Sequence, residues 1–237
     1  MRVDLQLAYI LHTRPYRDTS LLIDLLTPDY GRVTAVARGV RKNKTPKRQL
    51  LNPFSRLLVS WQGKTDMKLL TSFESDNLFL SLTANHLYSG FYLNELLVRL
   101  LPEMDSHNGI YHAYEHSLQA LQMGEDIEPL LRAFEFRLLE ELGYGLDFTQ
   151  DARNHCAIVP EGWYECHIQE GFFSAAPDIP EHFLLKGEAL LAIAVGDYSS
   201  SITRLTAKQL ARRLLKPLLG SRPLNSRELF VQHKPTE

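Results

Sequence analysis

The chain has 237 residues, of which 44% are hydrophobic and 23% are charged. This composition is typical of globular domains and excludes a chain that is disordered throughout. No run of 18 apolar residues occurs, which excludes a membrane-spanning helix, and two cysteines are too few for a disulfide framework. We therefore expect a cytoplasmic protein, and Asp4 near the N-terminus argues against a signal peptide.

The net charge of −2 conceals an uneven distribution along the chain. Residues 1–80 hold 13 lysines and arginines against 7 acids, residues 81–200 hold 5 against 19, and residues 201–237 hold 8 against 2. A basic head, an acidic middle and a basic tail indicate separate electrostatic roles for the three segments.

Short apolar runs in the first 80 residues predict five β-strands. Turn residues bound these runs, which lie near residues 5–11, 21–26, 32–37, 54–61 and 67–73. A longer insert, residues 39–53, follows the third run. Five short strands with this insert suit a small closed barrel such as an OB-fold, and an SH3-like barrel fits the same count.

From about residue 82 the apolar period changes to 3.6, which predicts helices. They cover residues 82–101, 110–123, 130–142, 186–196 and 204–219, and a short turn at 226–231 follows. Residues 150–180 lack this periodicity and predict an irregular insert with one short hairpin. The expected fold class is a multi-domain α+β protein: an OB-fold β-barrel domain at 1–80, an α-helical domain from 81–149 and 181–237, and the insert at 150–180.

The segment from Arg38 to Arg48 is the strongest sign of a binding partner, because it holds six basic residues in eleven and no acid. Such a run gains stability by meeting phosphates and releasing their counterions. Arg14, Arg17 and Lys64 lie in loops that flank the oligonucleotide groove of OB-folds. The predicted DNA-binding residues are Arg14, Arg17, Arg32, Arg38, Arg41, Lys42, Lys44, Lys47, Arg48 and Lys64. The alternative is a solvated loop that serves only solubility.

Aromatic residues accompany these cations. Tyr16, Tyr30 and Trp61 are candidates for stacking on unpaired bases. A tryptophan at a strand end also suits the core, so this signal is weaker than the charge.

The predicted helix at 204–219 is basic and amphipathic. Lys208, Arg212 and Lys216 recur every four residues and line one stripe, while Leu210 and Leu214 line another. Two interpretations are compatible with this pattern: a surface helix packed on the acidic middle segment, or an apolar groove rimmed by cations that receives an acidic peptide.

Two groups of residues suggest a metal, each with a simpler alternative. His112, Glu115 and His116 match a zinc-peptidase pattern on a predicted helix, but a plain surface helix gives the same pattern and no third ligand is evident. In the insert, His155-Cys156 and Cys166-His167 resemble zinc ligands, but adjacent pairs are poor chelators, which favours reduced thiols. We therefore predict no metal site, no cofactor and no catalytic residue.

Motifs along most of the chain, in order and spacing, resemble the RecO family of bacterial recombination mediators. The resemblance covers roughly residues 8–232 and rests on the segments 12–21, 30–32 with 37–41, 52–54, 87–96, 132–135, 142–145, 216–220 and 224–230. They include His12-Thr13-Arg14-Pro15-Tyr16-Arg17-Asp18, Leu142-Gly143-Tyr144-Gly145 and Lys216-Pro217-Leu218-Leu219-Gly220.

The resemblance implies a non-enzymatic protein that binds single- and double-stranded DNA and anneals complementary strands. With RecR as partner, it would help to load RecA onto strands coated by the single-strand-binding protein SSB, in the cytoplasm, at the nucleoid and away from membranes. SSB's acidic, phenylalanine-terminated tail is expected on the helical domain, where the candidate residues are Leu131, Arg132, Lys208, Leu210, Arg212, Leu214 and Lys216. Some members hold zinc with four cysteines in the insert, whereas this chain has two there. The alternatives are a protein-interaction scaffold and a zinc hydrolase.

Overall fold

The computed structural model describes residues 1–41, 46–78, 80–175 and 184–232. They form two compact units, the first comprising Met1–Ile127 and Ser221–Glu237 and the second Glu128–Gly220. This division cuts through the predicted helical domain. The reason is that the C-terminal helix, Ser226–Gln232, packs on the helix Ala84–Leu100 of the first unit.

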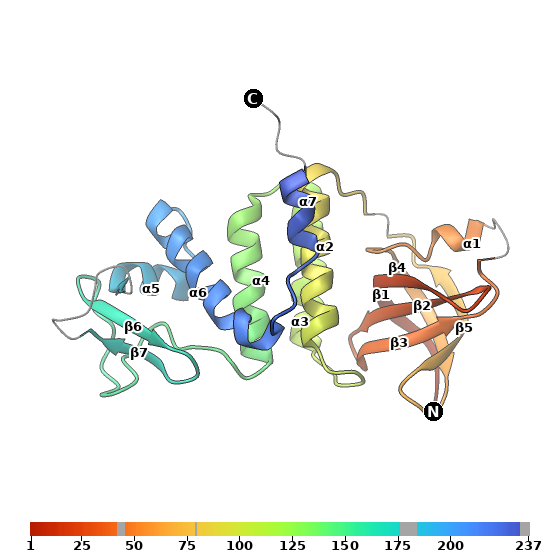
Figure 1. Ribbon diagram of the computed structural model, residues 1–237, viewed down its shortest axis with the longest axis horizontal. Coiled ribbons are helices and arrows are strands. Elements are labelled where there is room, and N and C mark those ends of the chain that lie inside the picture. The colour runs from red at the N-terminus through yellow and green to blue at the C-terminus, as the bar shows by residue number, and fades with distance from the viewer. Residues whose placement is uncertain (42–45, 79, 176–183, 233–237) are drawn as a thin grey trace. The chain divides into compact units, whose positions relative to one another are not determined.

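Five strands of the first unit close into a barrel in the order β1-β2-β3-β5-β4 (Figure 1). The strands are β1 Arg2–Tyr16, β2 Ser20–Thr27, β3 Gly31–Ala37, β4 Arg56–Gln62 and β5 Lys68–Ser75. All neighbours are antiparallel except β3 and β5, which are parallel. The OB-fold prediction is confirmed, and the insert after β3 contains a short helix, α1 Pro46–Gln49.

Apolar side chains from all five strands fill the barrel. They include Ala8, Ile10, Ile23, Leu25, Val33, Ala35, Val59, Trp61 and Leu70. Trp61 is fully buried, and its ring meets that of Tyr30 edge to face at 5.3 Å. Of the two alternatives given for Trp61, the core position is therefore the correct one, and its ring is not available to stack on bases.

Two bulges in β1 decide which side chains face inward. The register shifts between Val3 and Gln6 and again between Ile10 and His12. Leu5 sits at the first bulge with a φ of 52° and is exposed, whereas Tyr9 packs edge to face on Tyr114 at 5.3 Å. The strand is therefore buried on two sides near its middle, against the barrel interior and against helix α3 (Asn108–Met123), and simple alternation cannot describe it.

Three helices complete the first unit: α2 Ala84–Leu100, α3 Asn108–Met123 and α7 Ser226–Gln232 (Figure 1). Gly124 ends α3 in the left-handed conformation, as its position in the sequence predicts. The carboxylate of Glu95 on α2 accepts hydrogen bonds from the backbone amides of Asn225 and Ser226, which ties the start of α7 to α2.

A strap of residues 101–106 joins α2 to the barrel. The backbone amide of Met104 donates to the carbonyl of Arg32, and the Arg32 Nε donates to the carbonyl of Leu101, both at 2.9 Å. Gly31 has a φ of 61°, and a Cβ placed there would lie 1.6 Å from the Asp105 carbonyl oxygen. Only glycine allows the strap to come this close.

The second unit contains helices α4 Ile127–Glu141, α5 Gly187–Ala194 and α6 Ser201–Leu219. A three-stranded sheet in the order β7-β6-β8 lies between α4 and α5 in the chain. Its strands are β6 Trp163–His167, β7 Gly171–Ser174 and β8 Leu185–Lys186. The hairpin predicted in the insert is β6–β7, and β8 extends it into a sheet.

Replacing Gly31 by alanine tests the strap. Gly31→Ala should lower the free energy of unfolding by about 2–3 kcal/mol, because the new methyl group forces the strap away from β3. Gly39→Ala is the matched control, because Gly39 also has a positive φ but has no atom within 4 Å of the added Cβ. It should cost about 1 kcal/mol. Urea denaturation measures both values, and equal losses would contradict the role given to the strap.

Candidate nucleic-acid interface

The arginines of the barrel fall into two groups, and the first is bound to acids inside the protein. Arg56 on β4 forms ion pairs with both Asp76 and Glu115, and its guanidinium lies over the Tyr9 ring. Tyr9 in turn donates a hydrogen bond from its hydroxyl to Glu115. These contacts hold the barrel to α3, so Arg56 is a structural residue.

Arg32 belongs to the same group, although the sequence predicts that it binds DNA. Its side chain is 14% exposed and pairs with Glu103 at 3.1 Å, besides its bond to the Leu101 carbonyl. We therefore leave Arg32 out of the candidate interface, because its guanidinium binds Leu101 and Glu103 of the strap.

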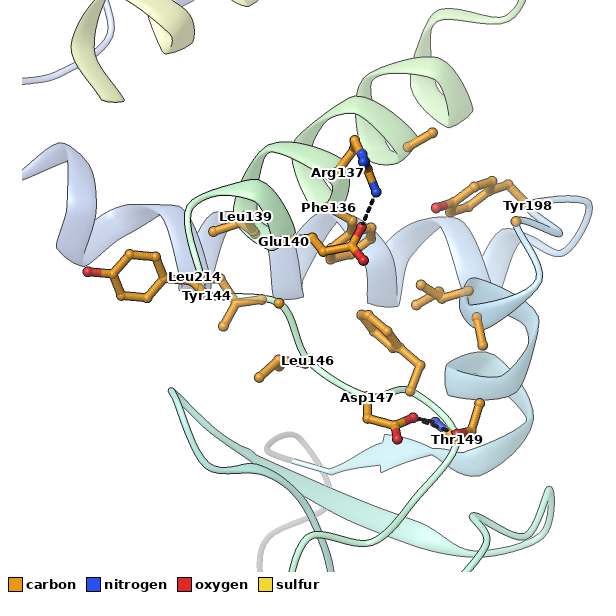
Figure 2. A pocket seen from close by; sticks show the side chains of 17 residues that line it. Phe136, Arg137, Leu139, Glu140, Tyr144, Leu146, Asp147, Thr149, Tyr198 and Leu214 are labelled. Atoms are coloured by element: carbon orange, nitrogen blue, oxygen red, sulfur yellow. Dashed lines mark hydrogen bonds and ion pairs between the residues drawn. The ribbon is translucent and has the colours of Figure 1, made fainter. Parts of the chain in front are cut away.

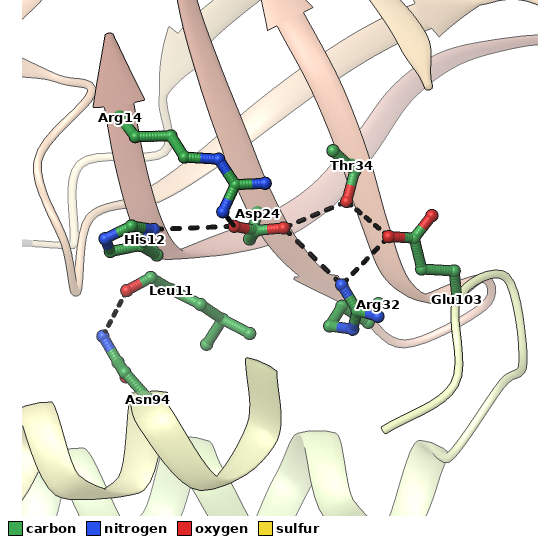
Figure 3. A network of polar contacts seen from close by, with 8 residues as sticks. All are labelled: Leu11, His12, Arg14, Asp24, Arg32, Thr34, Asn94 and Glu103. Carbon is green, nitrogen blue, oxygen red and sulfur yellow. Dashed lines mark hydrogen bonds and ion pairs between the residues drawn. The ribbon is translucent and has the colours of Figure 1, made fainter. Parts of the chain in front are cut away.

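Asp24 is buried at the centre of a polar network on the outer face of the barrel (Figure 3). One carboxylate oxygen accepts a hydrogen bond from Thr34, and the other lies 3.7 Å from His12 and 3.8 Å from Arg14. Burial favours the neutral acid, but His12, Thr34 and the nearby arginines outweigh it and lower the pKa of Asp24. Arg14 remains half exposed at the edge of this network.

The second group of arginines lies around the β1–β2 turn. The Arg41 amide donates to the Thr19 carbonyl and its guanidinium donates to the Arg17 carbonyl, each at 2.9 Å. The Arg17 guanidinium lies 5.3 Å from the Tyr16 ring centre. The structure therefore brings together Arg17 and Arg41, which are 24 residues apart.

A cleft of about 410 Å³ opens at this end of the barrel. The β1–β2 turn, the end of β3 and the start of β5 line it, through residues that include Tyr16, Arg17, Val36, Arg38, Met67 and Lys68. Asp18 is the one acid among its lining residues. The cleft therefore combines cations, an aromatic ring and an exposed methionine, a surface suited to nucleic-acid strands.

The remaining predicted DNA-binding residues are placed as follows. Lys64 and Arg48 are exposed, in the β4–β5 loop and on α1. Lys42 and Lys44 lie outside the described residues, as does the side chain of Lys47. Lys68, which the sequence analysis missed, is buried and donates from Nζ to the Thr65 carbonyl, so it shapes the β4–β5 loop.

The residues predicted to hold an acidic tail differ in burial. Leu131, Leu210 and Leu214 are buried in the second unit. Arg132 is buried as well and pairs with Glu135 at 2.9 Å. These four side chains pack within the second unit, and Leu214 also lines a cleft of that unit. Their part in binding an acidic tail stays a prediction.

The solvent face of α6 lies on another side of the helix. Arg212 and Lys216 are exposed as predicted, and so are Arg213, Ile202 and Leu205. Lys208 pairs with Glu128 at 2.8 Å, so its charge is partly neutralised. The face thus changes from apolar near the start of α6 to basic near its end.

A larger cleft of about 780 Å³ lies in the second unit (Figure 2). The end of α4, the segment 143–149, α5 and α6 line it, and Leu214 is the one predicted tail-binding residue among them. Arg137 at its edge pairs with Glu140 and Glu141. A cation neutralised in this way does not attract an acidic peptide.

The two metal hypotheses do not fit the geometry. Arg56 and Tyr9 both bind the Oε1 atom of Glu115, and the Oε2 atom lies 3.7 Å from the His112 ring, so this carboxylate is committed to a structural ion pair. Within the described ranges, no three His, Cys, Asp or Glu side chains are grouped so that they would hold a metal ion. In the insert, Cys156 is exposed and Cys166 is buried.

A buried carboxylate organises the insert instead. Asp151 accepts hydrogen bonds from the amides of Arg153 and Ser174 and from the Ser174 hydroxyl. Burial opposes its ionisation, but the bonds from Ser174, Arg153 and Asn154 prevail and lower the pKa of Asp151 to about 2. Asp151 thereby joins the loop at 151–154 to the end of β7.

Helices of the kind that cross a bilayer are absent from the part of the chain that the structure describes. Two family models match the sequence. "Recombination protein O N terminal" covers residues 1–79, and "Recombination protein O C terminal" covers residues 82–228.

Curated relatives agree with these matches over their full length. "DNA repair protein RecO" of Cellvibrio japonicus is 62% identical over 235 residues, which span 99% of this chain and 100% of the relative. The proteins of the same name from Alteromonas mediterranea and Haemophilus influenzae (strain Rd) are 42% and 40% identical. They align over 94% and 98% of this chain and 95% and 98% of their own lengths, respectively.

The role of Asp151 gives a pH-dependent prediction. Asp151→Ala should lower the free energy of unfolding by about 2 kcal/mol at neutral pH, because several partly buried backbone and hydroxyl donors lose their acceptor. The stability that this carboxylate contributes is complete above the unfolded pKa of about 3.8 and declines as the pH falls towards 2. The difference between the two proteins should therefore shrink over that range.

Asp147→Ala is the control, because Asp147 makes similar bonds to Thr149 on the exposed surface. It should cost less than about 1 kcal/mol. Thermal or urea unfolding at several pH values measures these losses. A gap between wild type and Asp151→Ala that stays constant from pH 6 to pH 2 would rule out the buried carboxylate as the cause.

Proposed function

The chain belongs to the RecO family of DNA repair proteins, and on this premise we propose that it is a non-enzymatic recombination mediator. In this proposal it binds single- and double-stranded DNA and anneals complementary strands. With RecR, it helps to load RecA onto DNA coated by SSB. The observation that carries the proposal is the open basic end of the barrel, set apart from the arginines that hold the fold together.

DNA binding is assigned to the cleft around the β1–β2 turn. Arg17, Arg38 and Arg41 face phosphates there, while Tyr16 and the exposed Met67 offer apolar contact to bases. Arginine contacts to phosphates release counterions and do not read sequence, which suits a protein that binds any strand and both strand forms.

Annealing requires no covalent chemistry in this account. Two single strands repel each other through their phosphates, and a basic surface that neutralises both lets complementary bases meet. The barrel is a rigid frame for the cations of the cleft. Arg32 and Arg56 are paired with acids and hold this frame to the strap and to α3, so they are separate from the binding surface. We infer no catalytic residue and no cofactor from this arrangement.

The SSB tail is assigned to the exposed face of α6. Its acidic residues would meet Arg212, Arg213 and Lys216, and its terminal phenylalanine would pack on Leu205 and Ile202. The proposal keeps two residues of the sequence-based set, Arg212 and Lys216, and replaces its buried leucines by exposed ones. RecR binding and the indirect contact with RecA are proposed from the family alone.

Charge reversal at the barrel end tests DNA binding. Arg17→Glu, Arg38→Glu and Arg41→Glu combined should weaken single-strand binding at least tenfold at low salt. The slope of log K against log salt concentration should fall by about 2, because roughly three phosphate contacts are lost. Fluorescence anisotropy with a labelled oligonucleotide at four salt concentrations measures both quantities.

Arg227→Glu on α7 makes the same kind of charge change away from the cleft and should leave the salt slope unchanged. If the triple variant binds like wild type, the barrel end is not the DNA site. A protein-interaction scaffold would then be the better account of its charge.

A separate pair of substitutions tests the tail site. Arg212→Glu with Lys216→Glu should reduce affinity for a synthetic SSB tail peptide about tenfold or more, because two charge contacts become repulsive. The same variant should bind single-stranded DNA at the barrel as wild type does. Calorimetry measures the peptide affinity, and Glu188→Gln on α5, a charge change off this face, is the control. An unchanged peptide affinity would remove α6 from the proposal.

A further inference from the structure

The sheet of the second unit has two faces of different character. Tyr164, Cys166 and Phe172 point to one side and are almost completely buried. Because successive residues of a strand alternate, the intervening residues Trp163, His167 and Phe173 lie on the other side. Trp163 is 44% exposed, so a large aromatic ring lies on the open face of a sheet whose core face is already filled.

Cations accompany the aromatic rings on this open face. The Lys186 ammonium lies 5.0 Å from the Trp163 ring centre, and the Arg153 guanidinium lies 5.5 Å from that of Phe173. The His167 ring is 4.6 Å from the Phe173 ring and tilted by 39°. Each aromatic ring therefore has a positive or ionisable group beside it.

Among the residues that the structure describes on β6, β7 and β8, Glu165 is the acid on this face. Glu165 stands between Trp163 and His167 on β6, opposite Phe173 on β7, and its carboxylate lies 3.7 Å from the His167 ring. Lys186 and Arg153 contact aromatic rings, and their positive charges can pair with the negative groups of a ligand. Two permanent positive charges, on Lys186 and Arg153, thus stand against the one carboxylate of Glu165 on the described part of this face.

We propose that this face is a second contact for single-stranded nucleic acid, on which bases stack against Trp163 and Phe173 while Arg153 and Lys186 meet the phosphates. An exposed sheet bearing aromatic rings is a surface on which unpaired bases stack, and every base has a ring face to offer. Flanking cations fix the backbone and strengthen the stack. The inference rests on the proposed DNA binding and gives it a second site, in the other unit from the barrel cleft.

A protein with two single-strand sites can hold two complementary strands at once. Annealing would then proceed between strands held on one molecule, at a high effective concentration. This consequence distinguishes the two-site protein from a barrel that binds one strand at a time.

Tryptophan fluorescence tests the proposal directly, because the chain has only two tryptophans and Trp61 is fully buried in the barrel. Adding an oligo-dT strand to the full chain should quench the emission of Trp163 as a base stacks on it. The variant Trp163→Phe keeps an aromatic ring and should bind the strand, but its remaining emission should not respond. Anisotropy of a labelled oligo-dT strand, measured in parallel, reports binding to either site.

The outcomes separate the two claims. Quenching in wild type that is lost in Trp163→Phe supports the sheet site. An anisotropy increase without quenching of Trp163 overturns the sheet site and leaves DNA binding intact, with a protein partner as the occupant of this face. No anisotropy increase at any protein concentration overturns both the sheet site and the proposed function.

An affinity measurement extends the test. In the background of Arg17→Glu, Arg38→Glu and Arg41→Glu, the second site should dominate the remaining binding. Adding Trp163→Ala should then reduce affinity roughly fivefold or more, whereas Trp163→Phe should retain most of it. Val195→Ala, at an exposed apolar position elsewhere in the unit, is the matched control and should change nothing. Equal affinities for Trp163→Ala and Val195→Ala would overturn the proposal.

Discussion

The pairing of Arg56 with Asp76 and Glu115 is the interaction on which the first unit depends. It joins β4, the segment after β5 and α3 beneath the Tyr9 ring, where charges with little access to water need partners. Arg32 and the strap repeat the same arrangement at β3. Because Arg32 and Arg56 are already neutralised, the exposed positive charge of the barrel is concentrated at the β1–β2 turn, after β3 and in the β4–β5 loop.

This separation of structural from exposed cations explains how a protein with a net charge of −2 would bind a polyanion, as we propose. A phosphate is attracted by the local electrostatic potential of a surface and not by the net charge of the whole protein. The acidic side chains of the helices mainly neutralise lysines and arginines next to them. Lys208 with Glu128 and Arg137 with Glu140 show this in the second unit. Arg17, Arg38 and Arg41 at the barrel end, together with the basic end of α6, are the surfaces available to anionic partners.

The sequence predicts the barrel strands, helices α2 to α6 and the hairpin of the insert within about five residues, because period and turn chemistry are local properties. Residues 226–231, expected as a turn, form helix α7 instead. The sequence predicts less well which face of a helix or strand is buried against the rest of the protein. Leu210 and Leu214 have the spacing of a binding groove and of a core alike, and they prove to be core. The bulges of β1 and the pairing of Arg32 with Glu103 depend on residues distant in the chain, and no local pattern encodes them.

The division between structural arginines and those proposed to bind DNA is tested most directly by the salt dependence of single-strand binding in two matched variants. Arg56→Gln should lower the free energy of unfolding, yet the folded fraction should bind oligo-dT with the salt slope of wild type. Arg38→Gln should leave stability unchanged and reduce that slope by about 0.7, the value of one lost phosphate contact. An equal reduction in both variants would contradict the division.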